Sequence, residues 1–340
     1  MTRIGNLYGP SATFLGVPAA DLDVPSSWES AQALIIGAPF DGGTSYRSGS
    51  RFGPLAIRTT DYLEHDGRRP HLALGVEPLT ELGVVDVGDI LMPSGDTATS
   101  LERLEAAVTA VASKGIMPVI LGGDHTIALP DVTGVARHVG WGRVAVIHFD
   151  AHADTAETQF GSLYGHGTPM RRLIESGACR GDRFLQIGLR GYWPEEETLD
   201  WMAEQKMRCF EMTEIVRRGM DSVLDEALTI ATTDCDAIFL SVDVDVVDPG
   251  SAPGTGTPEP GGLTSRQLLD AVRFIASNGP LGGMDVVEIS PPYDHADVTA
   301  FLGNRIVLEA LSATAWKRRR DRGETVRDPS RPLLERSSLH

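Results

Sequence analysis

Short, almost wholly apolar stretches recur along the chain and predict strands that are buried on both faces. They are rich in valine, isoleucine and leucine and lack the alternation of a strand with one face in solvent. Parallel strands between two layers of helices have this character. The six stretches that we interpret as strands span residues 33–39, 117–123, 144–150, 183–189, 237–245 and 283–290.

Longer segments with the helical spacing of apolar residues lie between these strands. We predict helices over residues 100–115, 265–279 and 299–316. The alternation of strand and helix predicts an α/β fold with three layers (αβα), in which helices cover both faces of a mostly parallel sheet. Ligand sites in such folds form beyond the carboxyl ends of the strands.

The two ends of the chain differ from the part between them. Residues 1–32 and 317–340 are rich in proline, serine and charge, and the second of these segments is a polar, basic tail. We therefore predict a single domain over residues 33–316. The N-terminal extension over 1–32 is a candidate oligomer contact.

The composition narrows the choice of partners. The 340 residues include 30 Lys and Arg against 47 Asp and Glu, a formal charge of −17. This argues against a nucleic acid or an anionic membrane and suits a cationic substrate or a metal, although solubility explains it equally well. Cys179, Cys209 and Cys235 form no CxxC pair, and no apolar run resembles a membrane span or a signal peptide. We expect a soluble cytoplasmic protein.

Acidic residues and histidines follow three of the predicted strands. They form DxHxD and DxD patterns and one separate histidine. The six positions are His125, Asp150, His152, Asp154, Asp243 and Asp245. Residues i and i+2 of a strand point to the same face, so the members of each pattern project together.

Four aspartates beside two histidines are costly to bury without cations, because an unpaired buried carboxylate is unstable and neighbouring carboxylates repel. Two divalent ions balance the four aspartates. A hydroxide nucleophile then leaves one negative charge, which a guanidinium ion neutralises. A lone aspartate after a strand is more often a turn cap, but that explanation does not fit the whole pattern. Oxygen-rich ligands favour Mn²⁺ over Zn²⁺, with Ni²⁺ or Co²⁺ as alternatives.

Four segments of the chain resemble the arginase–agmatinase family, the ureohydrolases. They are DGGTSYRSGSRFGP, GGDHTIALP, HFDAHADT, and SVDVDVVDPGSAPGTGTPEPGGLT followed by MDVVEISPPYD. The likeness is greatest to agmatinases and to guanidino-acid hydrolases such as guanidinobutyrase. It implies that residues 33–316 form one ureohydrolase catalytic domain with an eight-stranded sheet and an Mn²⁺ pair at its rim. It also implies a homo-oligomer, a trimer or hexamer.

The resemblance implies a role for each matched position. The metal ligands are His125 and His152 as terminal ligands, Asp150 and Asp243 as bridging carboxylates, Asp245 as the remaining ligand, and Asp154 as a ligand that also contacts the attacking water. His166 matches the proton-shuttle histidine of the family, and Glu288 matches the glutamate that holds the guanidinium. Asp154, His166 and Glu288 are thus the predicted catalytic groups. We interpret His148 as a hydrogen-bonded strand histidine, because it lies within its strand.

The expected reaction is hydrolysis of a guanidino C–N bond, which releases urea and an amine. Arginine is disfavoured, because Ala156 stands where arginases have an asparagine that helps to hold the amino-acid end. The expected substrate is 4-guanidinobutyrate, agmatine or a substituted guanidine. Gly250 and Ser251 replace an alanine and an aromatic residue of the relatives and predict a larger or more polar pocket. Two alternatives stay open: an amidine hydrolase that releases formamide, and a non-catalytic subunit of a hetero-oligomer.

Overall fold

The computed structural model describes residues 8–331 and 333. These residues form one eight-stranded sheet in the order β2-β1-β3-β8-β7-β4-β5-β6, and every neighbouring pair is parallel. The predicted α/β fold and all six predicted strands are confirmed. The strands are β1 (Ala33–Gly37), β2 (Val85–Asp89), β3 (Met117–Leu121), β4 (Val144–Phe149), β5 (Cys179–Leu189), β6 (Arg208–Glu211), β7 (Ala237–Asp243) and β8 (Leu281–Val287).

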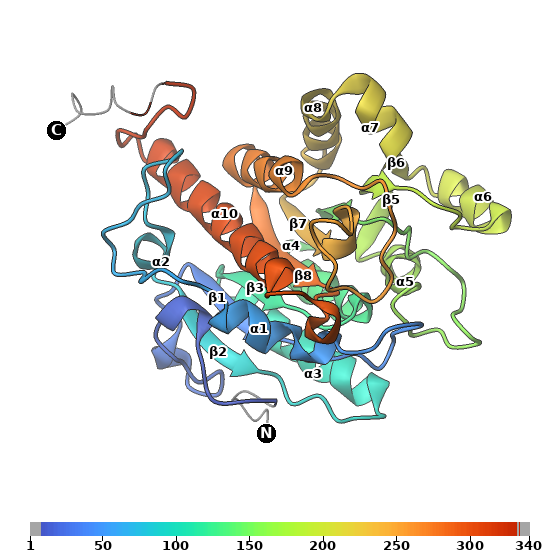
Figure 1. Cartoon of the computed structure of the whole chain (residues 1–340), viewed down its shortest axis with the longest axis horizontal. Helices are drawn as coiled ribbons and strands as arrows, with labels where there is room; N and C mark the ends of the chain where they lie inside the picture. The colour runs from blue at the N-terminus through green and yellow to red at the C-terminus, as the bar shows by residue number, and fades with distance from the viewer. Residues whose placement is uncertain (1–7, 332, 334–340) are drawn as a thin grey trace.

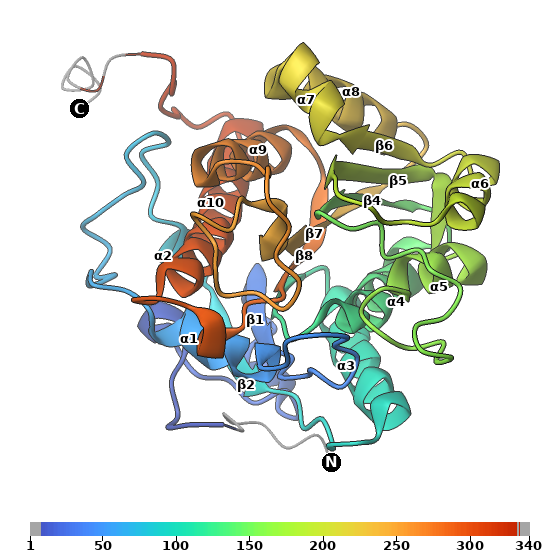
Figure 2. The ribbon, with the colours of Figure 1, turned by 45° about the vertical axis from the view of Figure 1, so that its right-hand side comes forward.

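Helices cover both faces of the sheet (Figures 1 and 2). One layer consists of α3 (Thr97–Ala112), α4 (Ala128–Val139) and α5 (Pro169–Ser176). The other consists of α1 (Gly53–Thr59), α2 (Pro78–Glu81), α7 (Met212–Arg218), α8 (Met220–Ala231), α9 (Ser265–Asn278) and α10 (Val298–Asp321). The remaining helix, α6 (Glu196–Glu204), packs beyond the end of β5. Within the described residues, no helix has the length and apolar character that a bilayer crossing requires.

Alternate residues of each strand supply two separate cores. In β1, Ala33 and Ile35 join the core beneath α8, α9 and α10. Leu34 and Ile36 join the core beneath α3, α4 and α5. Both faces of the strand are therefore buried, which explains why the sequence shows continuous apolar runs instead of alternation.

The two strands that the apolar pattern did not predict, β2 and β6, are the edges of the sheet. In β2, Asp86 and Asp89 form buried ion pairs with Arg58 of α1, so polar residues interrupt the apolar pattern. In β6 only Phe210 is buried. An edge strand is covered less completely than a central one and carries a weaker apolar pattern.

The last helix continues beyond the predicted end at residue 316 and stops at Asp321. Its last turn contains Arg318, Arg319 and Arg320, and positive charge favours the carboxyl end of a helix. Arg319 also pairs with Glu81 at 2.5 Å, which holds this turn against α2. Residues 1–7 of the predicted extension, and residues 332 and 334–340 of the predicted tail, lie outside the described part of the chain.

The carboxylate of Glu309 joins α10 to α9. It accepts two hydrogen bonds from Arg273, at 2.7 and 2.8 Å, and lies 3.1 Å from Nε2 of His71. Burial raises the pKa of Glu309, but the hydrogen bonds from His71 and Arg273 outweigh burial and lower it to about 2. The folded protein therefore favours the ionised form of this side chain.

Glu309→Gln is expected to reduce the free energy of unfolding by about 2 kcal/mol at pH 7, a value discounted for solvent screening. The folded pKa lies below the ordinary value of 4.5. The carboxylate thus stabilises the protein above that pH and loses its contribution as the pH falls through the folded pKa. Urea unfolding of both proteins at pH 7 and at pH 3 measures the difference. An equal loss at the two pH values would contradict this assignment.

Candidate active site and metal centre

The carboxyl ends of all strands meet at one edge of the sheet, because every neighbouring pair is parallel. Four adjacent central strands carry the predicted site residues there. His125 follows β3, and Glu288 follows β8. Asp243 ends β7, and Asp150 follows β4. Residues far apart in the sequence thus reach one place, which is where open α/β sheets bind ligands.

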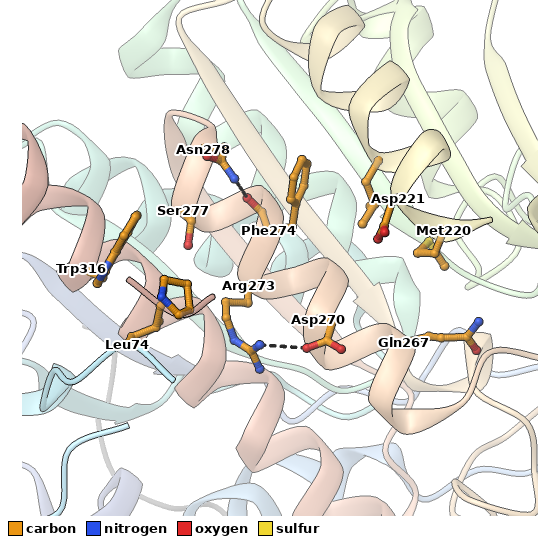
Figure 3. Close-up of a pocket in the computed structure, with 12 residues that line it drawn as sticks. Leu74, Met220, Asp221, Gln267, Asp270, Arg273, Phe274, Ser277, Asn278 and Trp316 are labelled. Atoms are coloured by element: carbon orange, nitrogen blue, oxygen red, sulfur yellow. Dashed lines mark hydrogen bonds and ion pairs between the residues drawn. The ribbon is translucent and has the colours of Figure 1, made fainter. Parts of the chain in front are cut away.

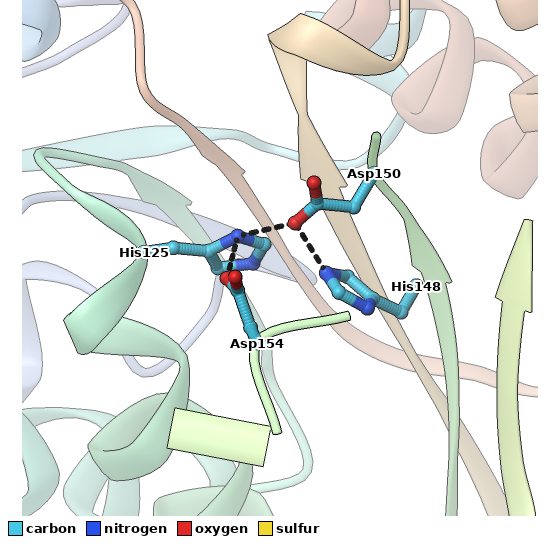
Figure 4. A group of neighbouring side chains, drawn as sticks. All are labelled: His125, His148, Asp150 and Asp154. Carbon is cyan, nitrogen blue, oxygen red and sulfur yellow. Dashed lines mark hydrogen bonds and ion pairs between the residues drawn. The ribbon is translucent and has the colours of Figure 1, made fainter. Parts of the chain in front are cut away.

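The first group of ligand atoms surrounds the imidazole of His125. Its Nδ1 lies 3.0 Å from Oδ2 of Asp150, 3.1 Å from Oδ2 of Asp154 and 3.2 Å from Oδ2 of Asp243. Figure 4 shows the contacts with Asp150 and Asp154. His125 is fully buried, so bulk water does not screen these charges from one another as it does at a protein surface.

The opposite side of the His125 ring determines which nitrogen carries the proton. Its Nε2 lies 2.9 Å from Oγ of Ser241, and the Ser241 hydroxyl donates to Oδ1 of Asp285 at 2.8 Å. Because the hydroxyl proton is directed to Asp285, the neutral ring donates from Nε2 and keeps a lone pair on Nδ1. Among the residues that the structure describes, none forms a hydrogen bond with that Nδ1. A lone pair and three carboxylate oxygens therefore converge, which is a ligand set for a cation.

A second group forms around His152. Its Nδ1 lies 3.0 Å from Oδ2 of Asp245 and 3.4 Å from Oδ1 of Asp150. Asp150 thus directs one oxygen to His125 and the other to His152. The structure brings all six predicted metal ligands together, in two groups that share this carboxylate.

The electrostatics of the two groups fit cations at their centres. Burial, together with repulsion from Asp245 and Asp150, raises the pKa of Asp243 well above its usual range. Burial likewise raises the pKa of Asp245. Burial lowers the pKa of His125, but the adjacent carboxylates of Asp150, Asp154 and Asp243 outweigh burial and raise that pKa well above its usual range. Without cations these carboxylates retain protons or repel one another, and divalent ions remove both costs.

His166 and Glu288 lie against each other beside the metal groups. Nδ1 of His166 is 2.9 Å from Oε1 of Glu288, and its Nε2 is 2.7 Å from Oγ of Ser45. The backbone N–H of Ser45 also donates to Nε2, at 3.1 Å. Burial lowers the pKa of His166, and the charge of Glu288 raises it to about 9. In the neutral form of the ring the proton lies on Nδ1, between the two side chains, because Nε2 accepts the backbone N–H of Ser45.

Two of the three predicted catalytic groups have an unusual backbone conformation. The φ angle is 53° at Asp154 and 63° at Glu288, in the left-handed region that side chains other than glycine seldom adopt. Such a conformation costs about 1–3 kcal/mol and persists where the surroundings enforce it, often at functional sites. The sequence carries no signal for this strain.

One oxygen of Glu288 is open to a donor. Oε1 accepts the backbone N–H of His125, at 2.9 Å, as well as the contact from His166. The buried Oε2 has no hydrogen-bond partner among the described residues. A Cβ at Gly256 would lie 3.2 Å from Oε2, so the glycine leaves space beside it. The geometry leaves one carboxylate oxygen, rather than two, for a guanidinium N–H.

A cavity of about 410 Å³ opens above the metal groups. Ser45, Asp154, Ala156, His166, Trp193 and Glu195 are among the residues that line it. Glu288 lies behind this wall, where it contacts His166. The described residues of the wall include aspartate and glutamate but no lysine or arginine. The cavity thus favours a cation over an anion.

A larger cavity of about 490 Å³ lies elsewhere, between α8, α9 and α10 (Figure 3). Its polar lining includes Asp270 and Arg273, which pair with each other at 2.8 Å. Neither group of candidate metal ligands contributes to it. The smaller cavity is therefore the candidate active site.

Sequence reasoning missed several contributors to the site. His148 is hydrogen-bonded, as predicted, but its partner is Oδ2 of Asp150, at 2.8 Å. Ser45 belongs to a segment recognised only by resemblance, and no pattern indicated that Trp193 and Glu195 line the cavity. Gly250 and Ser251 do not belong to the described wall of this cavity, and the prediction that they make the pocket larger or more polar stays a prediction.

Comparisons with known proteins agree with this geometry. The sequence profile of the arginase family matches residues 31–313. The chain is 35% identical over 305 residues to a guanidinobutyrase from Pseudomonas aeruginosa, covering 89% of this chain and 92% of that protein. It is 38% identical over 307 residues to a guanidinopropionase from the same organism, covering 89% and 93%. The solved structure of proclavaminate amidino hydrolase from Streptomyces clavuligerus matches with a TM-score of 0.80 and 34% identity, over 91% of this chain and 99% of that one.

Proposed function

This chain belongs to the arginase family and is a hydrolase acting on guanidino groups, and from that premise we propose that it uses two divalent metal ions to release urea from a small guanidino compound other than arginine. The observation that carries the proposal is the shared carboxylate of Asp150, whose two oxygens face His125 and His152. A carboxylate divided in this way suits a pair of ions held side by side.

Six residues would hold the two ions: His125, Asp150, His152, Asp154, Asp243 and Asp245. When bound there, the ions would supply Lewis acidity and an activated water at neutral pH. We propose Mn²⁺, because the ligand set is mostly carboxylate oxygen, with Ni²⁺ or Co²⁺ as alternatives. The donor set fits such ions, since it offers an imidazole lone pair and three carboxylate oxygens that converge on it.

The chain's own catalytic groups would bind the guanidinium and move protons. Glu288 offers its open Oε2 to a guanidinium N–H, a charge-assisted hydrogen bond. Asp154 lies at the cavity wall, where its carboxylate takes the proton of the attacking water and passes it to the leaving amine. His166 exchanges protons with solvent, because its Nε2 contacts the hydroxyl of Ser45, which also lines the cavity.

The cavity wall bears on the choice of substrate. Ala156 lines it and offers no hydrogen bond to an amino-acid end, which supports a substrate other than arginine. The two similar relatives named above act, by their names, on guanidino acids, whereas the described wall here has no lysine or arginine to meet a carboxylate tail. We give the wall more weight and favour agmatine, or a guanidine whose substituent carries no negative charge, over 4-guanidinobutyrate.

Urea release by the purified, metal-loaded protein tests the proposal. The panel is 4-guanidinobutyrate, 3-guanidinopropionate, agmatine, arginine, free guanidine and a biguanide, each with Mn²⁺ and with Ni²⁺. Urea from one compound supports the reaction and identifies the substrate. Formamide from a formimino compound, with no urea from any guanidine, would select the amidine-hydrolase alternative. No product from a protein with both ions bound would favour a non-catalytic subunit.

Glu195→Gln is expected to lower kcat/KM for agmatine about three- to five-fold at low salt, because an exposed carboxylate at the cavity mouth attracts the amine only modestly. Turnover of free guanidine, which has no tail, should not change. Glu196→Gln is the matched control, since Glu196 is the next residue and does not line the cavity. Equal losses for the two substrates would rule out a role of Glu195 in tail recognition.

Two further expectations belong to this proposal. We propose a homo-oligomer, a trimer or hexamer, with a hetero-oligomer as the alternative, and sedimentation of the purified protein tests it. We also place the enzyme in the cytoplasm. Its cysteines, Cys179, Cys209 and Cys235, are all unpaired, as is usual in a reducing compartment.

A further inference from the structure

His148 is a fully buried residue of β4 that contacts the shared carboxylate. Its Nε2 lies 2.8 Å from Oδ2 of Asp150 (Figure 4). Its Nδ1 lies 3.3 Å from Nε2 of Gln186, which belongs to β5. The ring packs edge-on against Phe184, with centroids 5.7 Å apart. Each nitrogen of this imidazole therefore has one polar neighbour.

The orientation of the Gln186 amide determines where the proton of His148 lies. The amide nitrogen donates to the carbonyl oxygen of Ala153, which is only an acceptor. The amide oxygen lies 3.2 Å from the thiol of Cys209, a donor. The second amide N–H thus faces Nδ1 of His148, which accepts it. The proton of the neutral ring is left on Nε2 and is donated to Asp150.

We propose that His148 is a positioning residue for the metal pair. Its hydrogen bond holds Oδ2 of Asp150 toward His125, and Gln186 sets the direction of that hydrogen bond. This inference rests on the proposed function, in which Asp150 is the shared ligand. The other oxygen, Oδ1, accepts the backbone N–H of His152 at 2.6 Å. Both oxygens of the carboxylate are therefore held, so it cannot rotate to give both of them to one ion. Partners of this kind orient ligands and tune metal affinity.

Direct metal ligation is the alternative role for His148. Its ligand atom lies within 4.8 Å of those of His125, Asp150 and Asp154. A ligating nitrogen must present a lone pair, however, and Nε2 is the protonated nitrogen of this ring. The geometry therefore assigns His148 to the carboxylate and not to the ion.

His148→Phe tests the proposal, because it keeps a ring against Phe184 and removes the donor. We expect the full-length protein to bind Mn²⁺ about 10- to 100-fold more weakly and still to bind two ions at saturation. Competition with a chelating dye gives the affinity, and elemental analysis gives the stoichiometry. His148→Gln, whose amide can donate, should recover part of the affinity. Gln186→Met should weaken Mn²⁺ binding less than His148→Phe does. It tests the same Gln186–His148–Asp150 hydrogen bonds if His148→Phe does not fold.

His71→Phe is the matched control. It removes another histidine–carboxylate contact, the 3.1 Å contact with Glu309, which lies apart from both metal groups. It should lower the melting temperature and leave Mn²⁺ affinity unchanged. Unchanged affinity in His148→Phe and Gln186→Met would overturn the inference, as would the loss of one ion from His148→Phe at saturation. If the wild-type protein bound no ions, the proposed function would fail, and this inference with it.

Discussion

Asp150→Asn is expected to reduce kcat for urea release by at least about 1,000-fold. This is more than the roughly 10- to 100-fold loss that follows removal of a residue hydrogen-bonded to a metal ligand. Asparagine has nearly the same shape but places an amide nitrogen where Asp150 presents an oxygen. That nitrogen would face either Nε2–H of His148 or the backbone N–H of His152, which are both donors. The variant should also bind fewer than two ions per chain.

Asp248→Asn provides the control for that result. Asp248 follows the same strand as Asp243, but its carboxylate accepts the backbone N–H groups of Gly250 and Gly261 and takes no part in the metal groups. Its activity should stay within a few-fold of the wild type. Steady-state kinetics, elemental analysis and far-UV circular dichroism distinguish a lost ion from a lost fold. A folded Asp150→Asn protein with full activity would contradict the assignment of Asp150 as a metal ligand.

Glu288→Gln is expected to lower kcat/KM about 100-fold, since truncating one partner of a buried charge pair costs about 3 kcal/mol. The amide has no charge to hold a guanidinium. It must also turn its only oxygen either to the donors that Oε1 now accepts or to the substrate. Glu288 belongs to neither metal group, so the variant should retain two ions. A variant that loses activity but keeps both ions would distinguish guanidinium binding by Glu288 from metal binding by Asp150.

Glu309→Gln is a suitable comparison for Glu288→Gln, because Glu309 is another largely buried carboxylate and lies apart from the cavity. Glu309→Gln should lower the free energy of unfolding and leave kcat/KM nearly unchanged. If Glu288→Gln also lost its metal, or if its KM and kcat were those of the wild type, the proposed guanidinium contact would be wrong. Titration with each ion and initial rates over a range of agmatine concentrations provide both readouts.

The central part of the fold is predictable from the sequence, and its edges are not. The strands buried on both faces carry continuous apolar runs, and β1 and β4 show this most clearly. At the edge, β2 buries Asp86 and Asp89, and both carboxylates pair with the buried Arg58 of α1. A pattern of apolar residues cannot reveal a strand whose polar residues are paired with a distant part of the chain.

The ligands of the site are predictable for a different reason. Asp150 directly follows β4 and Asp243 ends β7, and parallel strands carry both to one edge of the sheet. His152 and Asp245 each lie two residues farther on, beyond the ends of the strands, so they also lie at this edge. What surrounds the ligands depends on contacts between segments that no local pattern records. The proton direction in His148, the left-handed backbone of Glu288 and the position of Glu195 at the cavity mouth are of this kind.

The order of strands in the sheet has a consequence for how the protein folds. His125 and Glu288 hydrogen-bond across 163 residues of chain, and the residues of the site come from β3, β8, β7 and β4, which join only after several crossovers. Contacts of such long range form late and slowly. A complete set of ligands therefore exists only once the centre of the sheet has assembled. An ion that binds it would select the finished native state and slow its loss, so in the proposed metal enzyme the supply of metal would set the lifetime of the folded protein as well as its activity.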